Sequence, residues 1–147
     1  MAIKPFKPIL SKAQKERVVT AIRQAEKNTS GEIRVHLEKR CSGNPLERAA
    51  RVFNKLGMEK TALRNGILLY IATHSRRCAV YADQGIFEKV DPQAWEGVLE
   101  TLLPGLKKAE IELGIETAVF RIGEILRQFF PHQSDDKNEL SDDISES

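Results

Sequence analysis

The stretch GILLYIAT, residues 66 to 73, decides the fold of this chain. Every residue from Ile67 to Ala72 is apolar, and the run lacks the alternation of polar and apolar side chains that a half-exposed strand shows. Such a run is typical of a strand that is covered on both faces. We therefore expect it to be the central strand of a sheet that lies between helices.

The residues after this strand predict a hairpin. A short polar turn at 74 to 76 leads to a second strand, Cys78 to Ala82, which ends at Asp83-Gln84-Gly85. A three-residue turn would place Asp83 opposite Ile67 in the antiparallel pair. The hairpin returns the chain to the edge at which the central strand begins.

The residues before the central strand predict one strand and two helices. The segment from Ile33 to Leu37 alternates apolar and polar residues, as a strand with one partly covered face does. Apolar residues recur at helical spacing after Ser11, an N-cap residue, and again from Pro45 to the stop at Gly57.

Two further helices follow the hairpin. The first begins near Pro92, and Pro104-Gly105 is expected to interrupt or end it. The second carries an apolar stripe from Ala109 to Phe130. Residues 132–147 form an acidic tail that we expect to be disordered or docked as an extended arm.

The order helix, strand, helix, strand, strand, helix, helix predicts an α/β fold. A right-handed crossover joins two parallel strands, and the hairpin adds an antiparallel one. We expect a three-layer α/β/α sandwich with a small mixed sheet. Residues 11–131 would form the single domain, preceded by an extension, residues 1–10, and followed by the tail, residues 132–147.

Composition narrows the functional classes. Of 147 residues, 41% are hydrophobic, which suffices for one core, and no apolar run reaches the length of a membrane span. The N-terminus lacks a secretory signal, and the two cysteines are too few for a disulfide scaffold, so we expect a cytoplasmic protein. We also expect it to be a monomer. The net charge is +2, and the basic residues are interspersed with acids, which argues against nucleic-acid binding.

The predicted topology brings three polar residues to one edge of the sheet. Glu32, Asn65 and Asp83 would meet there, with close backbone approach at Gly31, Gly66 and Gly85. Carboxylate and amide oxygens are ligands for Ca²⁺ or Mg²⁺. The alternative is that these are ordinary turn residues and that Glu32 pairs with Arg34 or Arg64.

The opposite edge is cationic. This edge holds Arg40, His74, Arg76 and Arg77. These side chains could bind an anion, or they could simply form a solvated hairpin tip. On the first strand, His36 fits a satisfied, partly buried histidine better than a catalyst. No serine or cysteine has the setting of an activated nucleophile.

Three sequence motifs together resemble the TPM domain family, in particular its short soluble bacterial branch. They are TSGEIRVH at 29–36, RNGILLY at 64–70 and ADQGI at 82–86, and the acidic tail is similar to the ending common in that branch. The resemblance implies a mixed sheet between helical layers. Relatives include a thylakoid lumen protein linked to photosystem repair and proteins with weak acid phosphatase activity or divalent-metal binding. Where members often have an aspartate before Asn-Gly, this chain has Arg64.

Two functions remain open from the sequence. In the first, Asp83, Glu32 and Asn65 hold a divalent cation, calcium or magnesium, and Arg64 steadies an anionic substrate. Any enzyme activity would be at most that of a weak metal-dependent acid phosphatase. In the second, the domain is a non-enzymatic module for protein interaction or protein maintenance, and its partner is a protein.

Overall fold

A four-stranded mixed sheet in the order β3-β2-β1-β4 lies at the centre of the protein. The structure is a computed structural model that describes residues 9–107, 110–132 and 140–147. The elements follow one another along the chain as α1 (Lys12–Glu26), β1 (Glu32–Glu38), α2 (Pro45–Lys55), β2 (Gly66–Ala72), β3 (Arg77–Ala82), α3 (Gln84–Phe87), α4 (Gln93–Lys107), α5 (Ile111–Phe129) and β4 (Ser145–Glu146).

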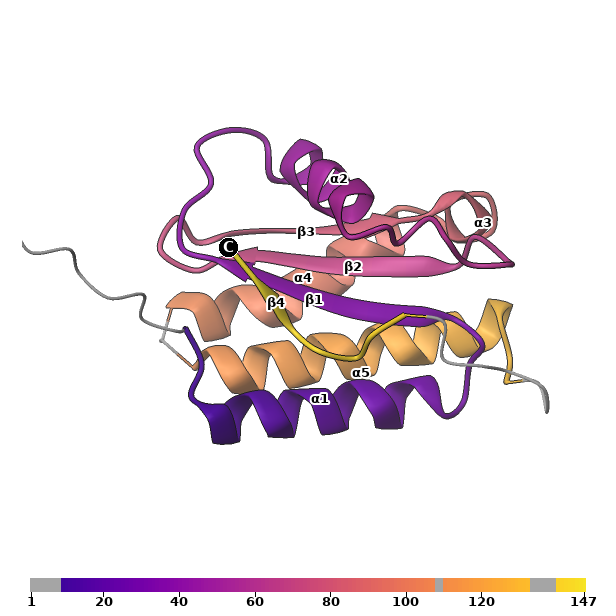
Figure 1. Cartoon of the computed structure of the whole chain (residues 1–147), viewed down its shortest axis with the longest axis horizontal. Helices are drawn as coiled ribbons and strands as arrows, with labels where there is room; N and C mark the ends of the chain where they lie inside the picture. Colours follow the sequence, from indigo (N-terminus) through magenta and orange to yellow (C-terminus); the bar gives the residue numbers. More distant parts are fainter. Residues whose placement is uncertain (1–8, 108–109, 133–139) are drawn as a thin grey trace, which may run out of the picture.

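The layers are those of the predicted α/β/α sandwich. α2 covers one face of the sheet, and α1, α4 and α5 cover the other (Figure 1). All seven residues of β2 are buried, as the unbroken apolar run predicts for a strand with a layer on each side. β2 pairs in parallel with β1 and antiparallel with β3, so the predicted mixed sheet is confirmed.

The core divides between the two faces of the sheet. Ile33, Val35 and Leu37 point to the face covered by three helices, where the larger apolar cluster lies. The alternate residues of β1 are polar yet buried: Glu32, His36 and Glu38 are 3%, 3% and 6% exposed. A buried row of polar side chains needs partners, and these partners define the candidate site.

Local sequence signals set most helix boundaries. Ser11 caps α1 as predicted, because its hydroxyl accepts from the backbone N–H of Gln14 while the side chain of Gln14 accepts from the N–H of Ser11. Gly57 follows α2 with a φ of 69°, a conformation that favours glycine.

The expected break at Pro104-Gly105 is wrong. α4 includes Pro104 and continues to Lys107. The last turn is held by packing, since a Cβ added at Gly105 would lie 3.2 Å from the Cα of Gly114 in α5. Close contact between the two helices compensates for the backbone hydrogen bond that proline cannot make.

The hairpin register differs by one residue from the prediction. Ala82, not Asp83, pairs with Ile67, and the N–H of Asp83 donates to the carbonyl of Gly66 at 2.9 Å. The turn contains four residues, Thr73 to Arg76, and Arg76 takes a φ of 52°. Asp83 therefore lies level with the first residue of β2.

Part of the tail forms a strand that the sequence analysis missed. β4 pairs in parallel with the outer edge of β1, His36 with Ser145 and Leu37 with Glu146 (Figure 1). The described residues 140–147 thus dock as an extended arm, one of the two expected alternatives. At the other end, Ile9 and Leu10 pack against the core, although the sequence assigned them to the extension.

Candidate functional site

The backbone brings the predicted residues to one edge of the sheet, the edge at which β1 and β2 begin. Glu32 is in register with Gly66, and its N–H donates to the carbonyl of Asn65 at 3.1 Å. Asp83 follows the last residue of β3 at the same edge. We call this the amino edge, made by Glu32, Asn65 and Asp83 together with Ser30.

Asp83 is engaged by an arginine at the amino edge. The Nε and Nη2 of Arg64 donate to the two carboxylate oxygens at 2.7 and 2.8 Å. The same carboxylate accepts from the N–H of Gln84 and caps α3. The hydrogen bond to Asp83 raises the pKa of Arg64, so the guanidinium stays charged. The sequence predicted that Arg64 would hold an anionic substrate and that Asp83 would bind a metal. In the structure these two side chains bind each other.

Asn65 has an oxygen without a partner. The residue is 1% exposed, and its Nδ2 donates to the carbonyl of Ser30 at 3.0 Å. Because that carbonyl can only accept, the amide orientation is fixed by its partner. Within the described residues no group donates to Asn65 Oδ1, and Ser30 Oγ is likewise without a partner. Two oxygens at the amino edge are thus left for another group.

Acidic side chains gather beside Glu32. Glu26 accepts from the N–H of Ile33 at 2.9 Å and hydrogen-bonds to Asp142 of the tail. Burial, that hydrogen bond and the nearby charges of Asp142 and Glu32 raise the pKa of Glu26 to about 10. Arg23 compensates part of this charge, 3.5 Å from Asp142. Because Glu26 carries a proton, Glu26 and Asp142 can form a hydrogen bond with each other.

The three predicted glycines differ in how tightly they are packed. A Cβ at Gly85 would lie 2.3 Å from the carbonyl oxygen of Leu63, and one at Gly66 would lie 3.0 Å from that of Met58. At Gly31 the nearest atom belongs to the movable side chain of Leu126. Gly85 is thus the position at which only glycine fits, and its N–H donates to the carbonyl of Arg64 at 2.9 Å.

In the described part of the chain, no three His, Cys, Asp or Glu side chains are arranged to hold a metal ion. The oxygen atoms that fit a cation best are those of Glu32, Asn65 and Ser30, because Asp83 is bound to Arg64. This donor set contains a single carboxylate and neutral oxygens, which suits a weakly bound hard cation.

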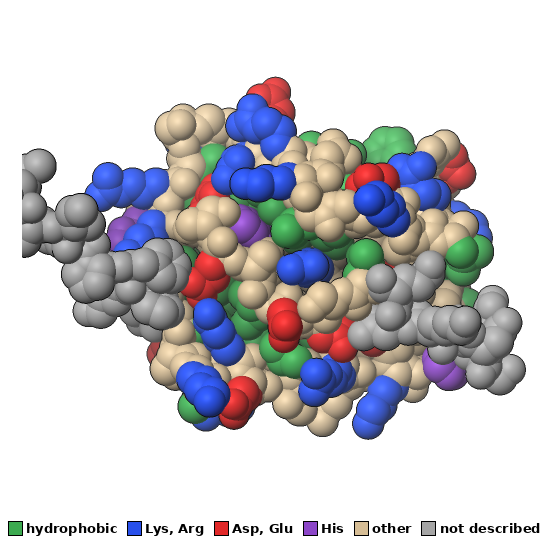
Figure 2. Space-filling view, in the orientation of Figure 1, with side chains coloured by type: hydrophobic (Ala, Val, Ile, Leu, Met, Phe, Trp, Pro, Cys, Tyr) green, Lys and Arg blue, Asp and Glu red, His purple; other side chains and the backbone are tan. Residues whose placement is uncertain are grey.

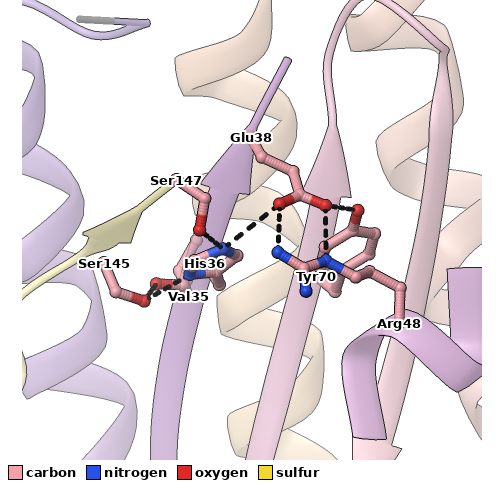
Figure 3. A network of polar contacts seen from close by, with 7 residues as sticks. All are labelled: Val35, His36, Glu38, Arg48, Tyr70, Ser145 and Ser147. Carbon is pink, nitrogen blue, oxygen red and sulfur yellow. Dashed lines mark hydrogen bonds and ion pairs between the residues drawn. The ribbon is translucent and has the colours of Figure 1, made fainter. Parts of the chain in front are cut away.

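A second polar network lies where β1 ends. The carboxylate of Glu38 accepts from Arg48 Nε and Nη2 at 3.0 and 2.9 Å and from the hydroxyl of Tyr70 (Figure 3). Burial disfavours the ionised Glu38, but the hydrogen bonds from Arg48 and Tyr70 outweigh it and lower the pKa of the carboxyl. A buried charge is thereby paired on both oxygens.

His36 joins this network to the tail. Its Nδ1 lies 2.7 Å from Ser145 Oγ and its Nε2 lies 2.8 Å from Ser147 Oγ, with Glu38 Oε1 3.8 Å away (Figure 3). Burial is the largest cause that lowers the pKa of His36, so the ring is neutral when the tail is docked. The predicted satisfied, buried histidine agrees with this geometry.

Sequence reasoning missed the partners of the buried polar row. Arg48 and Tyr70 lie ten and 32 residues from Glu38, and Ser145 lies 109 residues from His36. The polar residues of β1 were visible as an alternation, but the pattern does not say which side chains cover them. Glu38 itself gives no sequence signal for its partners, because Arg48 on α2 and Tyr70 on β2 reach it only through the fold.

Comparison with known proteins gives a family and a fold. The model of the TPM domain matches residues 4–125. Among solved structures, the NMR structure of the BA42 protein from the psychrophilic bacterium Bizionia argentinensis is 36% identical, covers 97% of this chain and 99% of its own, and has a TM-score of 0.89. No curated protein matches the chain.

Two more distant structures support the fold alone. The N-terminal domain of a P. gingivalis protein is 19% identical with a TM-score of 0.68, and covers 85% of this chain and 82% of its own. The N-terminal domain of cg2496 from Corynebacterium glutamicum is 11% identical with a TM-score of 0.62, and covers 94% and 81%. In the residues described here, no helix combines the length and apolar character needed to cross a membrane.

Proposed function

Because the chain belongs to the TPM domain family, we propose that it is a binding domain that takes up a divalent cation at the amino edge. The observation that carries this proposal is the buried Asn65 Oδ1, which has no partner in the described residues. An unpaired buried oxygen costs about 1 to 3 kcal/mol unless water or an ion meets it. Calcium and magnesium both take oxygen ligands.

In this proposal Glu32 supplies the charge, and Asn65 and Ser30 supply neutral oxygens. Asp83 stays with Arg64 and is not a ligand. The site is therefore narrower than the set Asp83, Glu32 and Asn65 expected from the sequence, and one carboxylate predicts weak binding.

Phosphatase activity has less support from the same geometry. Hydrolysis of a phosphate ester needs a metal that polarises a phosphoryl oxygen and activates water. The residue expected to hold the substrate, Arg64, uses Nε and Nη2 on Asp83. We propose cation binding without physiological hydrolysis. A cytoplasmic location and a monomeric state remain predictions from the sequence.

Titration of the ¹⁵N-labelled chain with Ca²⁺ and Mg²⁺ tests the cation site. We expect shifts of the Asn65 side-chain amide and of Gly31 and Gly66. Glu32→Gln should weaken binding at least about tenfold, the loss of one charge-assisted contact. Asp83→Asn, which keeps the helix cap, should change affinity less than about twofold.

A matched control for Glu32→Gln is Glu47→Gln, an exposed acid in the first turn of α2. No shifts at the amino edge, or equal losses in both variants, would overturn the cation site. Turnover of p-nitrophenyl phosphate that Asp83→Ala abolishes would restore the phosphatase assignment, and unchanged turnover would remove the amino edge from any catalysis.

A second candidate function is peptide binding, favoured by the open outer edge of β3. Within the described residues no strand pairs with that edge. A groove of about 340 Å³ runs beside it, lined by apolar residues that include Tyr81, Phe87, Trp95 and Leu99, and Phe87 is 68% exposed. An extended apolar peptide could add a strand to β3.

Peptides selected from a random display library provide the test of this second function. They should shift the signals of Arg77–Ala82 and lose binding in Phe87→Ser. Phe120→Ser, which alters an equally exposed phenylalanine on α5, is the control. Selected peptides that map to other surfaces would exclude the groove.

A further inference from the structure

We propose that a hollow at the carboxyl end of β1 binds a doubly charged tetrahedral oxyanion, phosphate or a small phosphomonoester, through Arg40, Arg48 and Arg51. The hollow has a volume of about 340 Å³. Besides the three arginines, it is lined by Glu38 and by the loop of residues 41–44. We call it the arginine hollow.

The charge of the arginine hollow is unbalanced. Three guanidinium groups face one carboxylate, and that carboxylate, Glu38, is already bound by Arg48 and Tyr70. Within the described residues neither Arg40 nor Arg51 has a carboxylate within 4 Å. Basic side chains gather around the segment between β1 and α2 in the space-filling view (Figure 2). This uncompensated positive charge favours the binding of an anion.

Arg48 is fixed before any ligand arrives. Its Nε and Nη2 donate to the two carboxylate oxygens of Glu38, which fixes the plane of the guanidinium. The hydrogen bonds to Glu38 raise the pKa of Arg48, so it keeps its charge. A guanidinium held in place loses little side-chain entropy on binding, which favours recognition of a planar or tetrahedral oxyanion.

The loop of residues 41–44 is also anchored. The N–H of Cys41 donates to Ser75 Oγ at 2.9 Å, and the carbonyl of Gly43 accepts from Arg77 Nη1 at 2.6 Å. The backbone N–H groups of Ser42, Gly43 and Asn44 have no acceptor among the described residues. Successive backbone N–H groups are donors that anion sites use.

The start of α2 is not the donor in this proposal. The side chain of Asn44 already caps the N–H groups of Leu46 and Glu47, at 2.8 and 3.3 Å. The arginines and the loop carry the site, and the helix contributes only the positive end of its dipole. The location agrees with the rule that ligands of α/β sheets lie outside the carboxyl ends of parallel strands.

The arginine hollow and the amino edge are independent sites. Glu32 and Glu38 stand at opposite ends of β1, which places them roughly 20 Å apart along the strand. An oxyanion in the hollow therefore does not share ligands with a cation at the amino edge. The titrations of the arginine hollow are made with EDTA present, so that their outcome does not depend on the cation site.

NMR and calorimetric titrations of the full chain at constant ionic strength test the hollow. The probes are inorganic phosphate, sn-glycerol 3-phosphate and, as a neutral control, glycerol. We expect the two anions to shift residues 40–51, and glycerol to shift nothing. Arg40→Gln/Arg51→Gln should weaken binding at least about tenfold, since two charge-assisted contacts are lost.

The matched control is Arg121→Gln/Arg127→Gln, which removes the same net charge from α5. Stronger binding of inorganic phosphate would assign the hollow to the free ion, and stronger binding of the ester would assign it to a phosphomonoester. No saturable shift with either anion, or an equal loss in the control variant, would overturn the proposal. Arg48 is left unchanged in the test because Glu38 depends on it.

Discussion

The two ends of β1 use the same kind of contact in opposite ways. At each end the Nε and Nη2 of one arginine donate to the two oxygens of a carboxylate. Arg64 donates to Asp83 at one end, and Arg48 donates to Glu38 at the other. At the amino edge the pair removes one carboxylate and leaves oxygens of Asn65 and Ser30 unpaired. At the other end the pair engages Glu38, the one carboxylate among the described residues that line the hollow, and the guanidinium groups of Arg40 and Arg51 have no carboxylate partner there.

This difference shows that ion pairing within a site determines whether the site attracts a cation or an anion. A bidentate pair is neutral, so the groups left around it determine which ligand is attracted. At the end with Arg64 and Asp83, the carboxyl groups of Glu26, Glu32 and Asp142 lie close together, with a proton on Glu26 and with Arg23 3.5 Å from Asp142. Around Arg48 and Glu38 the surplus is basic. One strand thus connects a candidate cation site to a candidate anion site.

The largest expected effect comes from removing the arginine of each pair. Arg48→Met leaves Glu38, whose side chain is 8% exposed, as an uncompensated buried charge, and should lower the free energy of unfolding by about 3 kcal/mol or more. Arg64→Met should cost less, because the side chain of Arg64 is 47% exposed against 32% for Arg48, and because Asp83, itself only 5% exposed, keeps the N–H of Gln84 at the start of α3. Urea unfolding measures both losses.

The control for this comparison is Glu38→Gln in the Arg48→Met background. Removing the buried charge should recover part of the lost stability, because a neutral amide can still accept from Tyr70. Equal losses for the two arginine variants would mean that the two pairs contribute alike to stability, and no recovery in the double variant would mean that the unpaired charge of Glu38 is not the cause of the loss.

A smaller effect concerns the residue that departs from the family pattern. Arg64→Asp removes the guanidinium from the amino edge, frees Asp83 and adds a carboxylate, so affinity for Ca²⁺ should rise about tenfold. Position 64 has a φ of 49°, which aspartate and asparagine tolerate better than most residues. Calorimetry measures the change.

Arg64→Asn is the matched variant, since it frees Asp83 without adding charge. Its affinity should lie between those of the wild type and of Arg64→Asp. If Arg64→Asp binds Ca²⁺ no more tightly than the wild type, the pairing of Asp83 with Arg64 is not what limits the amino edge.

Short-range patterns predicted most of the fold. The apolar run of β2 predicted a strand buried on both faces, and Ser11 predicted the start of α1, because each signal depends on neighbouring residues. Pro104 misled because contact with α5, remote in sequence, holds the last turn of α4. The one-residue error in hairpin register arose from turn length, which the residues 73–76 leave ambiguous.

The candidate site was only partly predictable for the same reason. Parallel pairing placed Glu32 and Asn65 at one edge, and this followed from the order of the elements. The ion pair between Arg64 and Asp83 depends on the positive φ at Arg64 and on the close packing of Gly85 against the backbone of Arg64. The composition of the chain reveals neither feature. The docking of Ser145 against His36 spans 109 residues and has no sequence signal.

A further expected effect concerns pH, and it has opposite signs at the two ends of the docked tail. Glu26 keeps its proton in the folded state up to about 10, whereas the unfolded state releases it above 4.5, so its contribution to stability is lost as pH rises through that interval. His36 has a lowered pKa when folded, so the unfolded state binds the extra proton below 6.5 and stability is lost as pH falls.

Two variants separate these contributions. Glu26→Gln should flatten the alkaline loss and leave the acid loss, while His36→Gln, which can still bond to the two serines, should do the reverse. Urea midpoints across the acid to alkaline range measure the slopes, and the amide signals of Ser145 and Glu146 report whether β4 stays docked. Glu26 and His36 both contact the tail. If β4 undocks only at alkaline pH, the contact of Glu26 holds the tail in place, and if it undocks only at acid pH, the contact of His36 does.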